Sequence, residues 1–272
     1  MTATIPAPVT APPPAPERAR SGPSTLRHGL TLAWRGVVKT INSPEALLDV
    51  TLQPVIFLLL FVYVFGGAIS GDTTTYLQFA LPGVLVQTVV FASVGTGTGL
   101  ADDLKTGIFD RFRSLPISRT APLLGAIGAD LVRYLTSGAI MLAFGFLLGF
   151  RASGVVGVLG ALGLVTVFAF ALCWVFTALA MVVREPRSVQ GLGALVMLPL
   201  TFGSNVFVPT ATLPGWLQGF VEVNPVSKVA DAARGLLTGG AVAGPAIASL
   251  LASAVLVGVF GPLAVTLYRR RT

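Results

Sequence analysis

Charged, cysteine and histidine residues are scarce in this sequence. Asp, Glu, Lys and Arg make up only 11% of the 272 residues, and there is one cysteine and one histidine. A single cysteine cannot form a disulfide within the chain, and a single histidine excludes the zinc motifs that need two. The sequence also lacks a G-x-S-x-G motif and a pair of carboxylates within an apolar run. We therefore expect no catalytic residues and no metal site.

A phosphate-binding loop is missing as well. The glycine-rich stretch VGTGTGL at residues 94–100 has neither the lysine nor the following Ser or Thr of such loops. It lies within an apolar run, where small residues let helices pack closely. Energy for any work that the chain does would have to come from elsewhere, either from an ion gradient, which usually requires a carboxylate inside a membrane span, or from a separate ATPase.

Apolar residues dominate what is present. They make up 54% of the chain, and the mean hydropathy of +0.83 lies outside the range of soluble globular proteins. The net charge of +7 does not indicate nucleic-acid binding, because the basic residues stand at the edges of apolar runs rather than on a polar surface. The expected environment is a lipid bilayer.

Six apolar runs are long enough, or nearly so, to cross a bilayer. A hydrocarbon core of about 30 Å needs about 20 apolar residues in a helix, and continuous runs favour helices over a barrel. We predict an all-α integral membrane protein with six transmembrane helices, at residues 48–69, 79–100, 122–150, 154–182, 189–208 and 242–268.

The basic residues predict the orientation of these helices. Cytoplasmic connections carry an excess of Lys and Arg. Such residues precede the first run, separate the second from the third and the fourth from the fifth, and follow the sixth. The opposite side has only Arg151, Lys228 and Arg234. Both termini are therefore predicted to be cytoplasmic, in a multi-pass protein of the plasma membrane.

Composition divides the chain into a tail, an interfacial helix and a membrane domain, at residues 1–23, 24–42 and 43–272. The tail is rich in Pro, Ala and Thr and has no long apolar stretch, which predicts a disordered cytoplasmic segment. The next segment places an apolar face opposite Arg35 and Lys39, with Trp34 suited to the headgroup level. This pattern is typical of an amphipathic helix lying in the membrane interface.

A charge-dense segment, DLKTGIFDRFRSLPISRT at residues 103–120, separates the second and third runs. Its apolar residues recur at helical spacing, while its charged residues face elsewhere. Gly107 weakens the middle of the segment and Pro116 ends it. The pattern predicts one or two short helices that form a docking surface for a cytoplasmic partner.

The connection before the sixth run predicts a re-entrant hairpin of two short helices on the outer side. Asn224 suits the cap of the second helix, Pro225 its first turn and Gly239 its end. A lid that only seals the bundle and a gate for substrate are both open interpretations. The charged residues expected to face water are Lys228, Asp231 and Arg234.

Polar residues within the runs are candidates for a substrate path, although each also fits a hydrogen bond between helices. Asp130 and Arg133 are three residues apart and share a helical face near the inner boundary. They form either a structural ion pair or a proton or substrate relay. The candidates for the path are Gln87, Thr88, Thr201, Ser204 and Asn205.

Two longer motifs carry a resemblance to a known family. GIFDRFRSLPISRTAPLLGAIGADLVR at residues 107–133 is similar to the signature region of type-two ABC exporter permeases, especially the daunorubicin-resistance-type permeases of actinobacteria. FVPTATLPGWLQGFVEVNPVSKVADAARGLLTG at residues 207–239 resembles the outer re-entrant region of the same family. With the six predicted helices, the resemblance covers nearly everything after the tail.

The resemblance implies a permease that exports hydrophobic or amphipathic compounds such as drugs. It implies a connecting helix before the first span, a second permease copy, and partner subunits that bind ATP and magnesium, whereas this chain itself holds no cofactor. Relatives that move polysaccharides or complex lipids provide an alternative, and a proton-coupled exporter is a further one. The residues that the family pattern places at the ATPase contact, within a coupling helix, are Gly107, Asp110, Arg111, Arg113 and Pro116.

Overall fold

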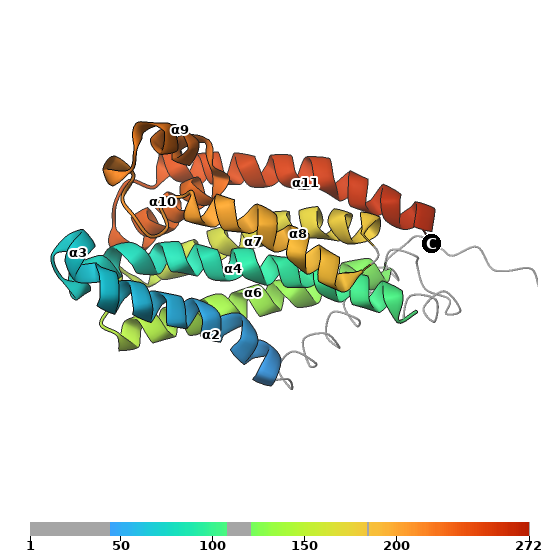
Figure 1. The fold of residues 1–272 in the computed structure, drawn as a ribbon, viewed down its shortest axis with the longest axis horizontal. Coiled ribbons are helices and arrows are strands. Elements are labelled where there is room, and N and C mark those ends of the chain that lie inside the picture. The colour runs from blue at the N-terminus through green and yellow to red at the C-terminus, as the bar shows by residue number, and fades with distance from the viewer. Residues whose placement is uncertain (1–43, 108–120, 184, 272) are drawn as a thin grey trace, which may run out of the picture.

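The computed structural model describes residues 44–107, 121–183 and 185–271, and every regular element in these ranges is a helix (Figure 1). This confirms the all-helical prediction for the described part of the chain. The elements are α2 (Pro44–Leu60), the π-helix η1 (Phe61–Phe65), α3 (Gly66–Ser70), α4 (Thr73–Lys105), α6 (Ala121–Leu147), α7 (Val155–Val182), α8 (Pro186–Phe202), the 3-10 helix η2 (Thr210–Thr212), α9 (Gly215–Val223), α10 (Pro225–Thr238) and α11 (Ala243–Arg271).

Five helical segments are long and apolar enough to cross a membrane. They are Leu52–Ser70, Thr73–Lys105, Gly125–Leu147, Val155–Val182 and Ala243–Tyr268, and they correspond to five of the six predicted runs. The fifth run forms α8, which has 17 residues and is therefore only about 26 Å long. It ends at Gly203, whose N–H donates to the Pro199 carbonyl, and the chain beyond it leaves the helix.

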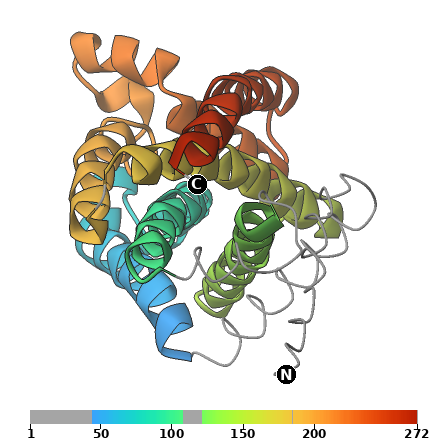
Figure 2. The ribbon, with the colours of Figure 1, turned by 90° about the vertical axis from the view of Figure 1, so that its right-hand side faces the viewer.

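α4 is the central helix of the bundle. The apolar window of this helix is 83% buried, compared with 17% to 39% for the other four candidate spans. Viewed along the helices, Figure 2 shows α4 between α2, α6, α7 and α8, with α11 on the other side of α7. Close approach of α7 depends on Gly97, because a Cβ atom there would lie 2.8 Å from the carbonyl oxygen of Phe176.

The two ends of the bundle differ in their connections. α4 ends, α8 begins and α11 ends at one end, where the Nζ atom of Lys105 lies 2.9 Å from the carboxylate of Glu185 (Figure 1). α3, α9 and α10 lie at the opposite end (Figure 1). The first end is the one that the basic residues predict to be cytoplasmic.

The signals for the second short helix of the outer connection are confirmed. The Asn224 side chain accepts from the N–H of Val226, Pro225 is the first residue of α10, and Gly239 follows its end with φ +82°. The prediction that Arg234 faces water is wrong. Only 17% of its side chain is exposed, because it turns inward toward α4 and the end of α8.

Candidate substrate-binding site

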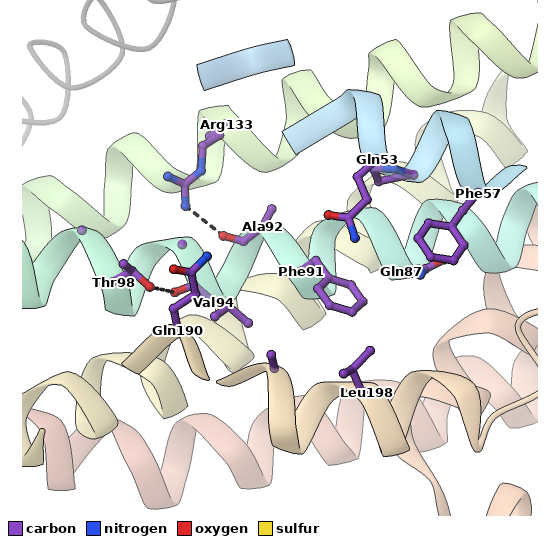
Figure 3. A pocket seen from close by; sticks show the side chains of 14 residues that line it. Gln53, Phe57, Gln87, Phe91, Ala92, Val94, Thr98, Arg133, Gln190 and Leu198 are labelled. Carbon is purple, nitrogen blue, oxygen red and sulfur yellow. Dashed lines mark hydrogen bonds between the residues drawn. The ribbon is translucent and has the colours of Figure 1, made fainter. Parts of the chain in front are cut away.

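A cavity of about 480 Å³ lies between the helices α2, α4, α6 and α8 (Figure 3). Its volume is in the range of small-molecule sites. α4 provides one long wall, α2 and α8 provide the facing walls, and α6 contributes a single side chain. The lining residues are Gln53, Pro54, Phe57, Gln87, Phe91, Ala92, Val94, Gly95, Thr98, Gly99, Arg133, Gln190, Ala194 and Leu198.

Arg133 is the charged side chain in this lining. Its Nη2 atom lies 2.9 Å from the Asp130 carboxylate, one turn earlier on α6. The same nitrogen donates to the carbonyl oxygen of Ala92 at 3.0 Å (Figure 3). It also donates to Oγ1 of Thr96 at 3.1 Å, and both acceptors are on α4. The Asp130–Arg133 pair therefore exists as predicted, and it also joins α6 to α4.

The guanidinium of Arg133 retains unused donors. Its Nε atom is enclosed and has no hydrogen-bond partner. Its Nη1 atom has no partner in the described part of the chain but is not enclosed. The group lies over Gly95, where a Cβ atom would stand 3.5 Å from Nη2, so this glycine leaves open space beside the charge.

Three glutamines on three different helices line the same cavity. Gln53 comes from α2, Gln87 from α4 and Gln190 from α8. Their side-chain amides make no hydrogen bond with any residue that the structure describes, and Oε1 of Gln87 is enclosed without a partner. Uncharged amides that both donate and accept suit a ligand with scattered polar groups on an apolar body.

Two phenylalanines add aromatic surface to the lining of the cavity. Phe57 on α2 and Phe91 on α4 stand beside Gln53 and Gln87 (Figure 3). Aromatic side chains with a small number of polar groups are typical of sites that bind drug-sized molecules. The arrangement can hold and orient an amphipathic ligand, but it offers no nucleophile paired with a base for chemistry among the described residues.

The predicted substrate-path residues lie in different places. Gln87 lines the cavity, whereas the hydroxyl of Thr88 donates to the Val84 carbonyl at 2.8 Å within α4. Thr201 is buried at the end of α8, and Ser204 donates to its carbonyl. Asn205 donates to the Asp231 carboxylate at 2.7 Å. The structure thus brings one of the five to the cavity and places the others within α4 or near the end of the bundle where α9 and α10 lie.

Asp231 and Arg234 form the second polar cluster. Arg234 donates from Nη1 to Asp231 at 2.8 Å, from Nη2 to the carbonyl of Asn205 at 3.0 Å and from Nε to the carbonyl of Phe79 at 3.2 Å. Its guanidinium also lies 4.0 Å from the centroid of the Phe79 ring. Burial lowers the pKa of Arg234, and the Asp231 charge opposes that shift. This cluster ties α10 to α4 and to the segment after α8.

The predicted coupling and connecting residues are described only in part. α4 runs to Lys105, past the predicted end of the second run at residue 100, and Gly107 follows it with φ +71°, a backbone conformation that glycine adopts without strain. The other predicted residues lie outside the described ranges, namely Asp110, Arg111, Arg113 and Pro116 of the coupling segment and Trp34, Arg35 and Lys39 of the connecting helix.

Sequence reasoning missed two of the glutamines and both aromatic side chains of the cavity. Gln53 and Gln190 stand inside the first and fifth apolar runs, so a search for every amide within a run would have found them. Phe57 and Phe91 carry no such signal, because phenylalanine is common throughout the runs. Arg133 was recognised only as the partner of Asp130.

Comparison with known proteins agrees with this architecture. Residues 28–238 match the family model described as ABC-2 type transporter. The chain is 45% identical over 257 residues to the daunorubicin resistance ABC transporter permease protein DrrB1 of Streptomyces coeruleorubidus, which covers 94% of this chain and 89% of the relative.

Two mycobacterial proteins are more distant relatives. The doxorubicin resistance ABC transporter permease protein DrrB of Mycobacterium tuberculosis is 30% identical over 78% of this chain and 76% of its own length. The probable doxorubicin resistance permease DrrC of the same organism is 29% identical over 80% of this chain and 79% of its own length. On the strength of the family match and of these relatives, this chain belongs to the ABC-2 type transporter family, as a membrane permease.

Proposed function

We propose that this chain is the permease subunit of an ATP-driven exporter of hydrophobic or amphipathic compounds, with anthracycline-like drugs as the first substrates to test. The observation that carries the proposal is the cavity between α2, α4, α6 and α8, where aromatic rings and unbonded amides line a space of drug size. The similarity to daunorubicin and doxorubicin resistance permeases supports the choice of substrates.

The topology that accompanies this proposal has six membrane crossings and cytoplasmic termini. α8, the fifth run along the chain, would be added to the five candidate spans as a further crossing despite its 17 residues. The segment 203–209 would extend it toward the outer end. α9 and α10 would form a re-entrant hairpin in the outer leaflet. The excess of basic residues at the other end supports this orientation.

Two partners belong to the proposal. An ABC ATPase would bind the segment that begins at Gly107, since both α4 and α6 emerge from the bundle at that end (Figure 1). A second permease copy, identical or paralogous, would cover apolar side chains on α2 and α8 next to the cavity, such as Ile56 at 52% exposed and Leu195 at 67% exposed. Coverage by a copy would enclose the cavity between two chains.

The experiment is co-expression of this chain with an ABC ATPase encoded beside it. We expect a stable complex whose ATP hydrolysis increases with daunorubicin, and ATP-dependent accumulation of daunorubicin in inverted vesicles. Asp110→Ala with Arg113→Ala should separate the subunits or abolish the stimulation while the permease still inserts. Lys228→Ala, far from the proposed contact, is the matched control. Unchanged stimulation in the double variant would remove the docking role from this segment.

Proton coupling is the second candidate, and Asp130 is the observation that would favour it, because it is a carboxylate inside a candidate span. Its contact with Arg133 favours a permanent ion pair over a carboxylate that exchanges protons. Transport by the permease without any ATPase, collapsing with the proton gradient and lost in Asp130→Asn, would establish this second function instead.

A further inference from the structure

The lining of the cavity contains one cationic side chain and no anionic one among the described residues. Arg133 is the ionised residue among its lining side chains, while the partner Asp130 stands behind it and does not line the space. The other polar lining groups are the three glutamine amides and the Thr98 hydroxyl, which already donates to the Val94 carbonyl at 3.2 Å. A ligand in the cavity therefore meets a cation and neutral dipoles.

Arg133 also concentrates its protein contacts on one nitrogen. A guanidinium has five N–H groups, and the contacts to Asp130, Ala92 and Thr96 all use Nη2. The hydrogens on Nε and Nη1 have no partner in the described part of the chain. A buried donor without an acceptor is unfavourable, and in a membrane span water does not readily replace the missing partner.

We propose that Arg133 is a specificity-determining residue that binds an oxygen acceptor, a carboxylate or a carbonyl, on the molecule in the cavity. The accessible Nη1 nitrogen of the guanidinium supplies donors to this oxygen, and Gly95 leaves room beside it. Phe57, Phe91 and the glutamines hold the apolar body of the same molecule. The inference rests on the proposed function only in taking the cavity as the substrate site.

A purely structural role for Arg133 makes different predictions. If the side chain served only to join α6 to α4, loss of either Asp130 or Arg133 would lower stability, and ligands of either charge would bind equally well. If Arg133 binds an oxygen acceptor, the two residues act in opposite directions. Asp130 competes with the ligand for the guanidinium, so removing its charge strengthens ligand binding, whereas removing Arg133 weakens it.

The test uses two probes with the same apolar body and different head groups, pyrenebutyrate and pyrenebutylamine. Each is titrated into the full-length chain in dodecyl maltoside, and binding is measured by energy transfer from tryptophan to pyrene. Wild type should bind pyrenebutyrate more tightly than pyrenebutylamine. Asp130→Asn combined with Arg133→Gln should raise the Kd of pyrenebutyrate about tenfold, because one charged hydrogen-bonding partner is lost. The Kd of pyrenebutylamine should change by less than about twofold.

Asp130→Asn alone is the decisive variant, since it should lower the Kd of pyrenebutyrate below that of wild type. Thr98→Val is the matched control, because it changes a cavity side chain whose hydroxyl is already bonded within α4, and it should alter neither Kd. Size-exclusion chromatography and thermal unfolding establish that each variant is folded. If the double variant does not fold, Arg133→Lys replaces it, since a lysine lacks the planar fork and should weaken pyrenebutyrate binding.

Equal binding of the two probes to wild type, or weaker pyrenebutyrate binding in Asp130→Asn, would overturn the inference. Failure of the proposed function looks different. In that case daunorubicin would not stimulate the ATPase, while the preference for pyrenebutyrate and the changes in its Kd in the variants would remain. The binding measurement needs neither ATP nor a partner, so the two proposals can fail independently.

Discussion

Two aspartate–arginine pairs of identical spacing serve different purposes in this molecule. Asp130–Arg133 on α6 and Asp231–Arg234 on α10 are both three residues apart, with N to O distances of 2.9 Å and 2.8 Å. Arg234 uses Nε, Nη1 and Nη2 to bind three separate acceptors. Arg133 makes its three contacts through Nη2 alone. Arg234 thus bonds to the protein through all three guanidinium nitrogens, and Arg133 through one.

The difference shows how neighbours decide the role of a motif. Around Arg234, the Phe79 ring, two backbone carbonyls and Asp231 engage all three guanidinium nitrogens. Around Arg133, Gly95 and the cavity leave Nη1 accessible. A polar cluster bonded through all its nitrogens fixes one arrangement of helices, whereas an unused donor beside a cavity is available to a ligand. We therefore expect mutations of Asp231–Arg234 to lower stability and mutations of Asp130–Arg133 to change ligand binding.

The largest expected effect is the loss of stability in Arg234→Ala. Two backbone carbonyls and Asp231 lose their donor together, which should lower the free energy of unfolding by roughly 3 kcal/mol. Thermal unfolding of the purified chain in detergent measures this loss. Lys228→Ala removes a cation from the same helix without a side-chain hydrogen bond among the described residues, and it should be nearly neutral. An equally small effect of Arg234→Ala would remove the contrast between the pairs.

At the Asp130–Arg133 pair, we expect a small loss of stability and a large loss of ligand binding. Asp130→Asn with Arg133→Gln removes both charges together, so that neither is left unpaired, and the free energy of unfolding should change by no more than about 1 kcal/mol. The Kd of pyrenebutyrate should rise about tenfold, the equivalent of about 1.4 kcal/mol. Unchanged pyrenebutyrate binding with a large loss of stability would make the two pairs alike.

A smaller effect is expected at Asn224, which links the start of α10 to α8. Its side chain caps α10 at the Val226 N–H, 2.9 Å away, and donates to the Leu200 carbonyl at 2.7 Å. Asn224→Ala should cost about 1 to 2 kcal/mol of stability. Asn224→Ser retains an acceptor for the cap and loses the donor to α8, so the difference between the two variants isolates the cap. Equal losses would show that the cap contributes nothing.

The smallest effect is expected at Asp72, an exposed cap that is engaged only by its own helix. It accepts from the N–H and the hydroxyl of Thr75, and these hydrogen bonds lower the pKa of its carboxyl below 3.8. Because the folded pKa is the lower one, the stabilisation is complete above pH 3.8 and is lost as the pH falls through the folded value. Unfolding measured between pH 5 and pH 2 should show this slight loss in wild type and not in Asp72→Asn.

Much of the fold could be predicted because its signals are local. Six runs of apolar sequence appear as helices close to the expected positions, and Asn224, Pro225 and Gly239 bound α10 as their backbone preferences require. The prediction of a full-length fifth run was less accurate. Gly203 and the polar residues after it leave the helix early, because Ser204 and Asn205 bond to the chain around them instead.

The site was less predictable, because it depends on which helices meet. The sequence places Gln53, Gln87 and Gln190 far apart, and nothing in their spacing says that they line one space. The same holds for Arg234, whose expected exposure to water was wrong because Phe79, 155 residues away, covers it. Long-range contacts of this kind have no periodic signal along the chain.

The sequence by itself determined that this chain is helical and suited to a membrane, and its motifs indicated an exporter permease. These signals are local, because they depend on residues that are close together in the sequence, and they can therefore be found without the structure. They are the runs of apolar residues, the basic residues beside them and the helix caps. Only the tertiary structure decided which of two similar aspartate–arginine pairs is bonded through every guanidinium nitrogen and which faces a cavity. That distinction depends on the acceptors that neighbouring helices bring within about 3 Å of each guanidinium nitrogen.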